Sequence, residues 1–207
     1  MNAIILDCDD VLLQFMPGIE DSARKAGLDP CPKGPGSFDL SAWLGLSRED
    51  TGRLIRQFIE DEESVFGQLP PIDGALEGVR VLKEAGFELY VLSSFSDQLG
   101  PLRRRTDNLD RLFGAGTFKD IMGLALGSSK LEALKRMNPS IFVDDLLRNA
   151  CEGVAAGHEV LWMKAHHTLH DFHTTPTPQG VIKVETWEDI IDQVMKDQPV
   201  AERIPMI

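Results

Sequence analysis

The sequence has few cysteines, no long apolar run and fewer basic than acidic residues. Three cysteines in 207 residues provide no disulfide framework and are typical of a reducing compartment. The apolar run at residues 3–6 is too short for a signal-peptide core, and no apolar stretch approaches the ~20 residues that a membrane-spanning helix needs. These absences predict a cytoplasmic protein with no membrane partner.

The charge balance is strongly acidic. Lys and Arg number 21 against 33 Asp and Glu, which gives a formal net charge of −12 at pH 7. Such a surface repels phosphate backbones, so we expect no nucleic-acid polymer as a partner, whereas a small anionic substrate would need a local cation to receive it. The composition, 43% hydrophobic and 26% charged, is typical of a globular domain and leaves the oligomeric state open.

Strands and helices alternate along most of the chain. Apolar runs predict strands at residues 3–6, 87–92, 118–126, 141–143, 160–163 and 181–184. Helices are predicted at residues 41–46, 47–62, 73–85, 98–112, 128–137, 149–156 and 186–196. This alternation favours an α/β fold with a doubly wound parallel sheet, and the Pro/Gly-rich and helical residues 16–69 predict a small helical insert after the first strand.

Polar side chains follow three of the predicted strands. Asp7 and Asp9 follow the first strand, Ser93 ends a second, and Asp144 and Asp145 end a third. The carboxyl ends of parallel strands share one edge of a sheet, so these side chains should meet there. Crowded carboxylates either take up protons or bind a cation, and an all-oxygen site with room for water suits Mg²⁺.

Four segments carry these residues in a recognisable order. They read IILDCDDVL from Ile4, LYVLS ending at Ser93, GSSK ending at Lys130, and IFVDD followed four residues later by Asn149. Together they resemble the four motifs of the haloacid dehalogenase-like (HAD) superfamily. The resemblance implies a HAD-like Rossmannoid core of residues 1–15 and 70–197, a helical C1 cap of residues 16–69, and a C-terminal tail of residues 198–207.

The resemblance also implies a reaction, the Mg²⁺-dependent hydrolysis of a small phosphomonoester. Asp7 would be the nucleophile that forms an aspartyl phosphate, and Asp9 would protonate the leaving group and then activate water. Mg²⁺ would be held by Asp7, the backbone carbonyl of Asp9 and Asp145. The D-x-D pair favours a phosphatase or a phosphomutase over a dehalogenase.

The remaining motif residues would bind phosphate or orient other groups. Ser93 and Ser94 would donate hydrogen bonds to phosphate oxygens, and Lys130 would add positive charge. Asp144 would orient Lys130 or a metal-bound water, with Asn149 beside it.

Two further segments resemble the 5′(3′)-deoxyribonucleotidase branch of the superfamily. They are VLLQF, which ends at Phe15, and PIDGAL from Pro71. This resemblance implies a nucleoside monophosphate as substrate, with Phe15 and a cap aromatic such as Trp43 or Phe38 holding the base, although core packing is the alternative for each ring. A sugar phosphomutase and a non-catalytic binding protein on the same scaffold remain alternatives.

Three other features suggest sites but favour simpler interpretations. His166, His167, His170 and His173 run into a Thr/Pro-rich stretch, which favours a solvated loop over a metal site. The arginines at 103–105 favour the exposed face of a helix over a role in attracting phosphate. Cys8 should point away from the site and into the core.

Overall fold

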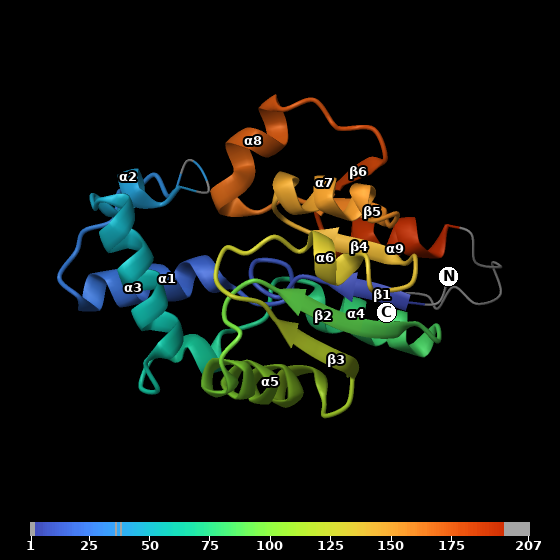
Figure 1. Cartoon of the computed structure of the whole chain (residues 1–207), viewed down its shortest axis with the longest axis horizontal. Coiled ribbons are helices and arrows are strands. Elements are labelled where there is room, and N and C mark those ends of the chain that lie inside the picture. Colours follow the sequence, from blue (N-terminus) through green and yellow to red (C-terminus); the bar gives the residue numbers. More distant parts are fainter. Residues whose placement is uncertain (1–2, 36, 38, 197–207) are drawn as a thin grey trace.

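The computed structural model describes residues 3–35, 37 and 39–196, and within them one six-stranded sheet forms the centre of the molecule (Figure 1). Every strand pair is parallel, and the strand order is β3-β2-β1-β4-β5-β6. The strands are β1 (Ala3–Leu6), β2 (Glu88–Ser93), β3 (Phe118–Gly123), β4 (Ile141–Asp144), β5 (Glu159–Met163) and β6 (Val181–Val184). The predicted doubly wound α/β fold is confirmed.

The central strand β1 fixes where the site lies. Ile4, Ile5 and Leu6 are fully buried, as expected for a short apolar strand that is covered on both faces. Leu6 is in register with Val91 of β2 and Val143 of β4. The residues that follow these three strands therefore emerge side by side at the carboxyl edge.

Helices cover both faces of the sheet. They are α4 (Ala75–Glu84), α5 (Leu99–Phe113), α6 (Leu131–Leu134), α7 (Leu147–Ala155), the 3₁₀ helix η2 (His166–Thr168), α8 (Leu169–Thr174) and α9 (Trp187–Met195). The helix predicted at residues 128–137 is regular only over α6. Beyond it, Arg136 and Met137 donate to carbonyls three residues back, and these tight turns lead the chain into β4. No helix in the described part of the chain is both long and apolar enough to cross a bilayer.

Helix α9 is tied to the loop that follows β1. Its N-terminus has a capping box formed by Thr186 and Asp189, as the predicted start at residue 186 requires. The indole of Trp187 packs over Gly78 of α4 and donates a hydrogen bond of 2.9 Å to the carbonyl oxygen of Val11. This contact supports the loop that carries Asp7, Asp9 and Asp10.

In the described part of the chain, four helices lie between β1 and α4, and we call them the helical insert. They are α1 (Phe15–Lys25), α2 (Ser41–Leu44), α3 (Arg48–Glu60) and the 3₁₀ helix η1 (Val65–Gln68). They lie beyond the end of the sheet towards which the arrows of β2 and β3 point (Figure 1). Ser47 caps α3 through a 3.1 Å bond from the Asp50 amide, as the sequence pattern predicts.

The two connections of the insert run side by side. The Gln14 amide donates to the carbonyl of Pro70 at 2.9 Å, and the Ile72 amide donates to that of Leu12 at 2.9 Å. The Gln14 side chain adds a 2.8 Å bond to the carbonyl of Pro71.

The division into core and cap at residues 16–69 stays a prediction. The predicted tail at residues 198–207 lies outside the described residues, as does Phe38.

Candidate active site

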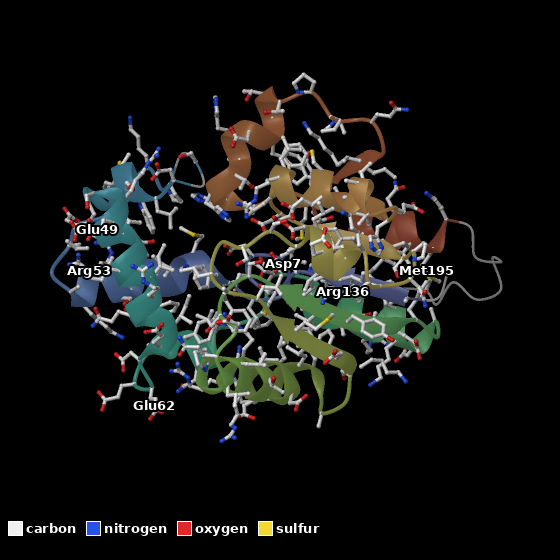
Figure 2. The ribbon with its side chains drawn as sticks, in the orientation of Figure 1. Asp7, Glu49, Arg53, Glu62, Arg136 and Met195 are labelled. Atoms are coloured by element: carbon white, nitrogen blue, oxygen red, sulfur yellow. The ribbon has the colours of Figure 1, made fainter. Side chains whose placement is uncertain are left out.

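The acids that end β1 and β4 converge at the carboxyl edge of the sheet. One carboxylate oxygen from each of Asp7, Asp144 and Asp145 lies within 4.8 Å of the others, and all three residues are buried. Asp7 lies near the middle of the molecule, between the sheet and the insert (Figure 2). The amide of Asp7 continues the strand pairing by donating to Val143 at 2.9 Å, so the backbone sets this position.

Lys130 is the buried cation of the cluster. It is fully buried, and its Nζ lies 2.9 Å from Asp7 Oδ1 and 2.7 Å from Asp144 Oδ2. Burial alone would lower the pKa of Lys130, but the charges of Asp144 and Asp7 outweigh it and raise the pKa above its usual value. Its backbone amide is bound by Glu152 at 2.7 Å, which fixes the start of α6. Lys130 therefore carries its charge between two carboxylates at neutral pH.

Asp144 and Asp145 are neighbours with different surroundings. Asp144 accepts hydrogen bonds from the Asn149 side chain at 3.0 and 3.1 Å and from the Leu146 amide at 2.8 Å, and burial raises its pKa to about 7. The carboxylate of Asp145 lines the cavity described below, and burial raises its pKa well above the usual value. The carbonyl of Asp145 is held by the Trp162 indole at 2.9 Å. Asp144 is thus locked by hydrogen bonds, while Asp145 faces the cavity.

Asp9 is paired with Arg105, which was predicted to lie on the exposed face of a helix. Arg105 Nη2 donates to Asp9 Oδ1 at 2.7 Å, and the arginine side chain is fully buried. The prediction that residues 103–105 form an exposed helix face is therefore wrong for Arg105. Pro101, Arg105, Asn108 and Leu109 are the buried residues of α5, and this helical spacing was the available signal. Burial raises the pKa of Asp9 to about 6, although the Arg105 charge acts in the opposite direction.

Asp10 links the loop after β1 to the insert and to His167. It has a left-handed φ of 57°, and its Oδ1 accepts the Phe15 and Met16 amides at 3.1 and 3.4 Å. Asp10 thereby accepts hydrogen bonds from two backbone amides in the first turn of α1. This helix was not predicted from the sequence. Burial raises the pKa of Asp10 to about 7.

His167 lies between two of the acids. Its Nδ1 is 3.4 Å from Asp10 Oδ2, and its Nε2 is 3.2 Å from Asp145 Oδ2. The residue is buried in η2, and burial lowers the pKa of its imidazole. The solvated-loop interpretation of the histidine segment is therefore wrong for His167. The signal was its place four residues after the end of β5, because residues that follow parallel strands gather at this edge.

A cavity of about 410 Å³ opens above these groups. The core contributes Asp7, Asp9, Ser93, Ser94 and Lys130 to its lining, all of them predicted site residues. Ser93 is buried at the end of β2, and the Ser94 hydroxyl donates to the Ser128 carbonyl at 3.0 Å. The insert closes the other side with Phe15, Met16, Asp39, Leu40, Ser41, Arg48, Thr51, Gly52 and Ile55.

The two predicted aromatic contacts lie in different places. Phe15 lines the cavity and packs edge-on against Phe58 at 5.7 Å between ring centroids. Trp43 is buried, donates its indole N–H to the Cys31 carbonyl at 3.1 Å and lines a second cavity, which is also lined by Met163 and Glu185 of the core. Cys8 is fully buried in the core, as predicted.

The donor set fits a hard divalent cation. Asp7 and Asp145 offer carboxylate oxygens at the cavity, and oxygen ligands with room for water are what Mg²⁺ requires. Asp144 lies close enough to be a third ligand, but its oxygens already accept four hydrogen bonds, from Lys130, the Leu146 amide and the Asn149 side chain. Asp7 and Asp145 are therefore the better ligands of the three.

Comparison with known proteins gives the fold but no closer relative. No protein-family model matches the sequence, and no curated protein matches it. Among solved structures, a predicted phosphatase from Clostridium acetobutylicum is 16% identical and superposes with a TM-score of 0.64 over 94% of this chain and 98% of that one. A haloacid dehalogenase-like hydrolase from Streptococcus pneumoniae is 15% identical, with a TM-score of 0.65 over 94% and 98% of the two chains.

A third similar structure contains ligands. The HAD family hydrolase from Deinococcus radiodurans, with bound phosphate and sodium, is 14% identical and has a TM-score of 0.59 over 100% of this chain and 99% of that one. The agreement over almost the whole length of each chain establishes that this chain has the fold of HAD-type hydrolases.

Proposed function

We propose that the chain is a Mg²⁺-dependent phosphomonoester hydrolase that acts through an aspartyl phosphate on Asp7. The observation that carries the proposal is the buried Asp7 carboxylate, which lines the cavity with Lys130 Nζ at 2.9 Å and Asp145 beside it. A carboxylate and a fixed ammonium group at one point of a cavity suit attack on an anionic phosphorus centre. The fold of HAD-type hydrolases agrees with this reaction.

Asp7 and Asp9 divide the chemistry between them. An Asp7 oxygen forms a bond to phosphorus while the bond from phosphorus to the leaving oxygen breaks, and Asp9 gives its proton to that oxygen. In the second step Asp9 takes a proton from water, the water oxygen attacks phosphorus, and the Asp7 carboxylate and inorganic phosphate are released. A pKa of about 6 allows Asp9 to alternate between these two states near neutral pH.

The neighbouring groups stabilise negative charge on the transferring group. Ser93 and Lys130 both line the cavity, where the Ser93 hydroxyl and the Lys130 ammonium would bind phosphoryl oxygens. Asp7, the Asp9 backbone carbonyl and Asp145 would hold Mg²⁺, which when bound supplies further positive charge to the phosphoryl group. Asp144 and Asn149 keep Lys130 in place through the contacts given above.

The lining of the insert supports a small organic leaving group. Leu40, Ile55, Met16 and the Phe15 ring present apolar surface opposite the acids, and a cavity of about 410 Å³ holds a metabolite rather than a polymer. We propose a nucleoside monophosphate, with the Phe15 ring against the base.

Phosphate release tests the reaction. The purified chain is incubated with p-nitrophenyl phosphate and with a panel of nucleoside monophosphates and sugar phosphates, with Mg²⁺ or with EDTA. We expect turnover that needs Mg²⁺ and falls by more than about a thousandfold in Asp7→Asn. Asp107→Asn, at an exposed position of α5, is the matched control and should retain activity.

Three outcomes would contradict parts of the proposal. Equal rates in the wild type and Asp7→Asn, or no turnover at all, would refute the hydrolase and favour a binding protein. A phosphorylated enzyme that isomerises a sugar phosphate without net phosphate release would identify a phosphomutase. Equal kcat/KM for nucleoside monophosphates and sugar phosphates would refute the substrate class.

A further inference from the structure

We propose that Arg105 is a positioning residue for the Asp9 carboxylate, and that the helical insert holds Arg105 in place through Phe66. The proposal rests on the proposed function, in which Asp9 donates a proton to the leaving group. It assigns a role to a residue on α5, which carries none of the four motifs.

The contact between Arg105 and Asp9 is short and shielded from water. Nη2 of Arg105 lies 2.7 Å from Asp9 Oδ1, and the exposed fractions of the two side chains are 0% and 17%. A guanidinium group is planar and stays charged, so it fixes the direction of the carboxylate it binds. Within the described residues, the ion pair uses only Oδ1, and Asp9 also lines the cavity, so its second oxygen is available to a substrate there.

The rest of the guanidinium group is held by aromatic rings. Its Cζ lies 3.9 Å from the ring centroid of Phe66 and 5.3 Å from that of Phe95. Neither Nε nor Nη1 of Arg105 has a hydrogen-bond partner within the described part of the chain. Cation–π contacts and one ion pair offset only part of the cost of burying a charge, so an apolar residue would suit the fold as well. The contact with Asp9 is what explains an arginine at this position.

Phe66 makes this arrangement depend on the insert. It belongs to η1, the last helix of the insert, and packs against Phe58 of α3 at 5.9 Å between ring centroids. Arg104, next to Arg105, donates to the carbonyls of Ile59 and Asp61 at the end of α3. Helix α5 therefore contacts the insert through Arg104 and Arg105, and Arg105 also binds the Asp9 carboxylate. Lifting the insert away from α5 would remove Phe66 from the guanidinium and release the carboxylate.

Two classes of leaving group distinguish positioning from simple structural support. p-Nitrophenolate leaves without a proton, whereas an alkoxide needs one from Asp9. We therefore compare kcat/KM for p-nitrophenyl phosphate with that for an alkyl phosphomonoester that the wild type hydrolyses, because kcat/KM reports only the steps up to departure of the leaving group and excludes the later step in which Asp9 activates water. Arg105→Gln should lower kcat/KM for the alkyl ester by about tenfold or more and lower kcat/KM for the aryl ester by less than about threefold.

The ratio of kcat/KM for the alkyl ester to kcat/KM for the aryl ester is measured in four further variants. Asp9→Asn should show the same selective loss, and adding Arg105→Gln to it should change the ratio no further. Phe66→Leu keeps the arginine but removes the ring from its face, and should shift the ratio in the same direction by a smaller factor; it carries the test if Arg105→Gln does not fold. Arg103→Gln, at an exposed position of the same helix, is the control and should match the wild type.

Equal losses on both esters in Arg105→Gln, or a further selective loss in the Asp9→Asn background, would overturn the positioning role. This result is distinct from failure of the proposed function, which would show as phosphate release that does not depend on Asp7.

Discussion

The buried lysine at the centre of the site gives the sharpest stability prediction. In Lys130→Met, Asp7 and Asp144 lose an ammonium group at 2.9 and 2.7 Å and remain buried. Removing one partner of a buried ion pair costs about 3–5 kcal/mol, and 1 kcal/mol lowers the melting temperature of a domain this size by about 2–4 °C. We therefore expect the melting temperature to fall by about 6–20 °C at pH 7.5 without Mg²⁺.

The loss of stability in Lys130→Met should be larger at high pH than at low pH. The Lys130 charge lowers the pKa of Asp144, so its removal raises the folded-state pKa of that carboxyl further above its unfolded value. A raised carboxyl pKa favours the folded state at low pH, and that stability is lost as pH rises through the folded pKa. The difference in melting temperature between the wild type and Lys130→Met should therefore be smaller at pH 5.5 than at pH 7.5.

Thermal unfolding followed by circular dichroism measures both effects. Lys135→Met removes a lysine whose side chain is 48% exposed and paired with Glu132, and should cost less than about 1 kcal/mol. Lys130→Met combined with Asp144→Asn should recover part of the loss, because one unpaired carboxylate is then absent. A melting temperature for Lys130→Met within about 2 °C of the wild type at pH 7.5 would refute the buried charge cluster.

Three further predictions concern packing, the metal and pH. Gly78→Ala should lower the free energy of unfolding, measured by chemical denaturation, by about 1–3 kcal/mol, because the added Cβ would lie 2.2 Å from the Trp187 ring. Gly100→Ala, with open space around it, should leave the free energy of unfolding unchanged or raise it. Equal effects of the two substitutions would contradict the packing of Trp187 over Gly78. His167→Asn should weaken Mg²⁺ binding in calorimetry by about 10- to 100-fold, since His167 contacts Asp145, and unchanged affinity would show that the contact is dispensable. Without Mg²⁺ the wild type should melt at a lower temperature at pH 8 than at pH 5, because burial raises the folded-state pKa values of Asp9, Asp10 and Asp144 to about 6 to 7. Mg²⁺ should reduce this difference in melting temperature. A melting temperature that rises with pH would contradict the upward direction of these pKa shifts.

The sheet and the carboxylates at its edge were predictable because their signals are local. Short apolar runs that end in Asp7, Ser93 and Asp144 mark buried parallel strands, and the geometry of such sheets brings their ends together. The approximate helix limits follow from caps such as Ser47 and Thr186.

The remaining features depend on contacts between distant segments. Helix α1 begins where Asp10 accepts its first amides, so its start carries no cap of the usual kind. Arg105 lies in a run of three arginines, and its burial is set by Phe66 and Asp9 from other elements. His167 becomes part of the site only because η2 folds back over Asp10 and Asp145.

The two adjacent connections of the insert allow the inserted segment to be replaced during evolution with little effect on the stability of the sheet. A segment whose ends are anchored next to each other imposes a closure entropy that grows only with the logarithm of its length, about 0.6 kcal/mol for each doubling. The hydrogen bonds of Gln14 to Pro70 and of Ile72 to Leu12 anchor the ends in this way. Longer, shorter or unrelated segments can therefore be exchanged between these anchors at little thermodynamic cost to the sheet. On the proposed function, the choice of ligand by the insert and the chemistry at the sheet edge can then evolve separately, except through α5, whose Arg104 and Arg105 contact the insert and whose Arg105 also binds Asp9.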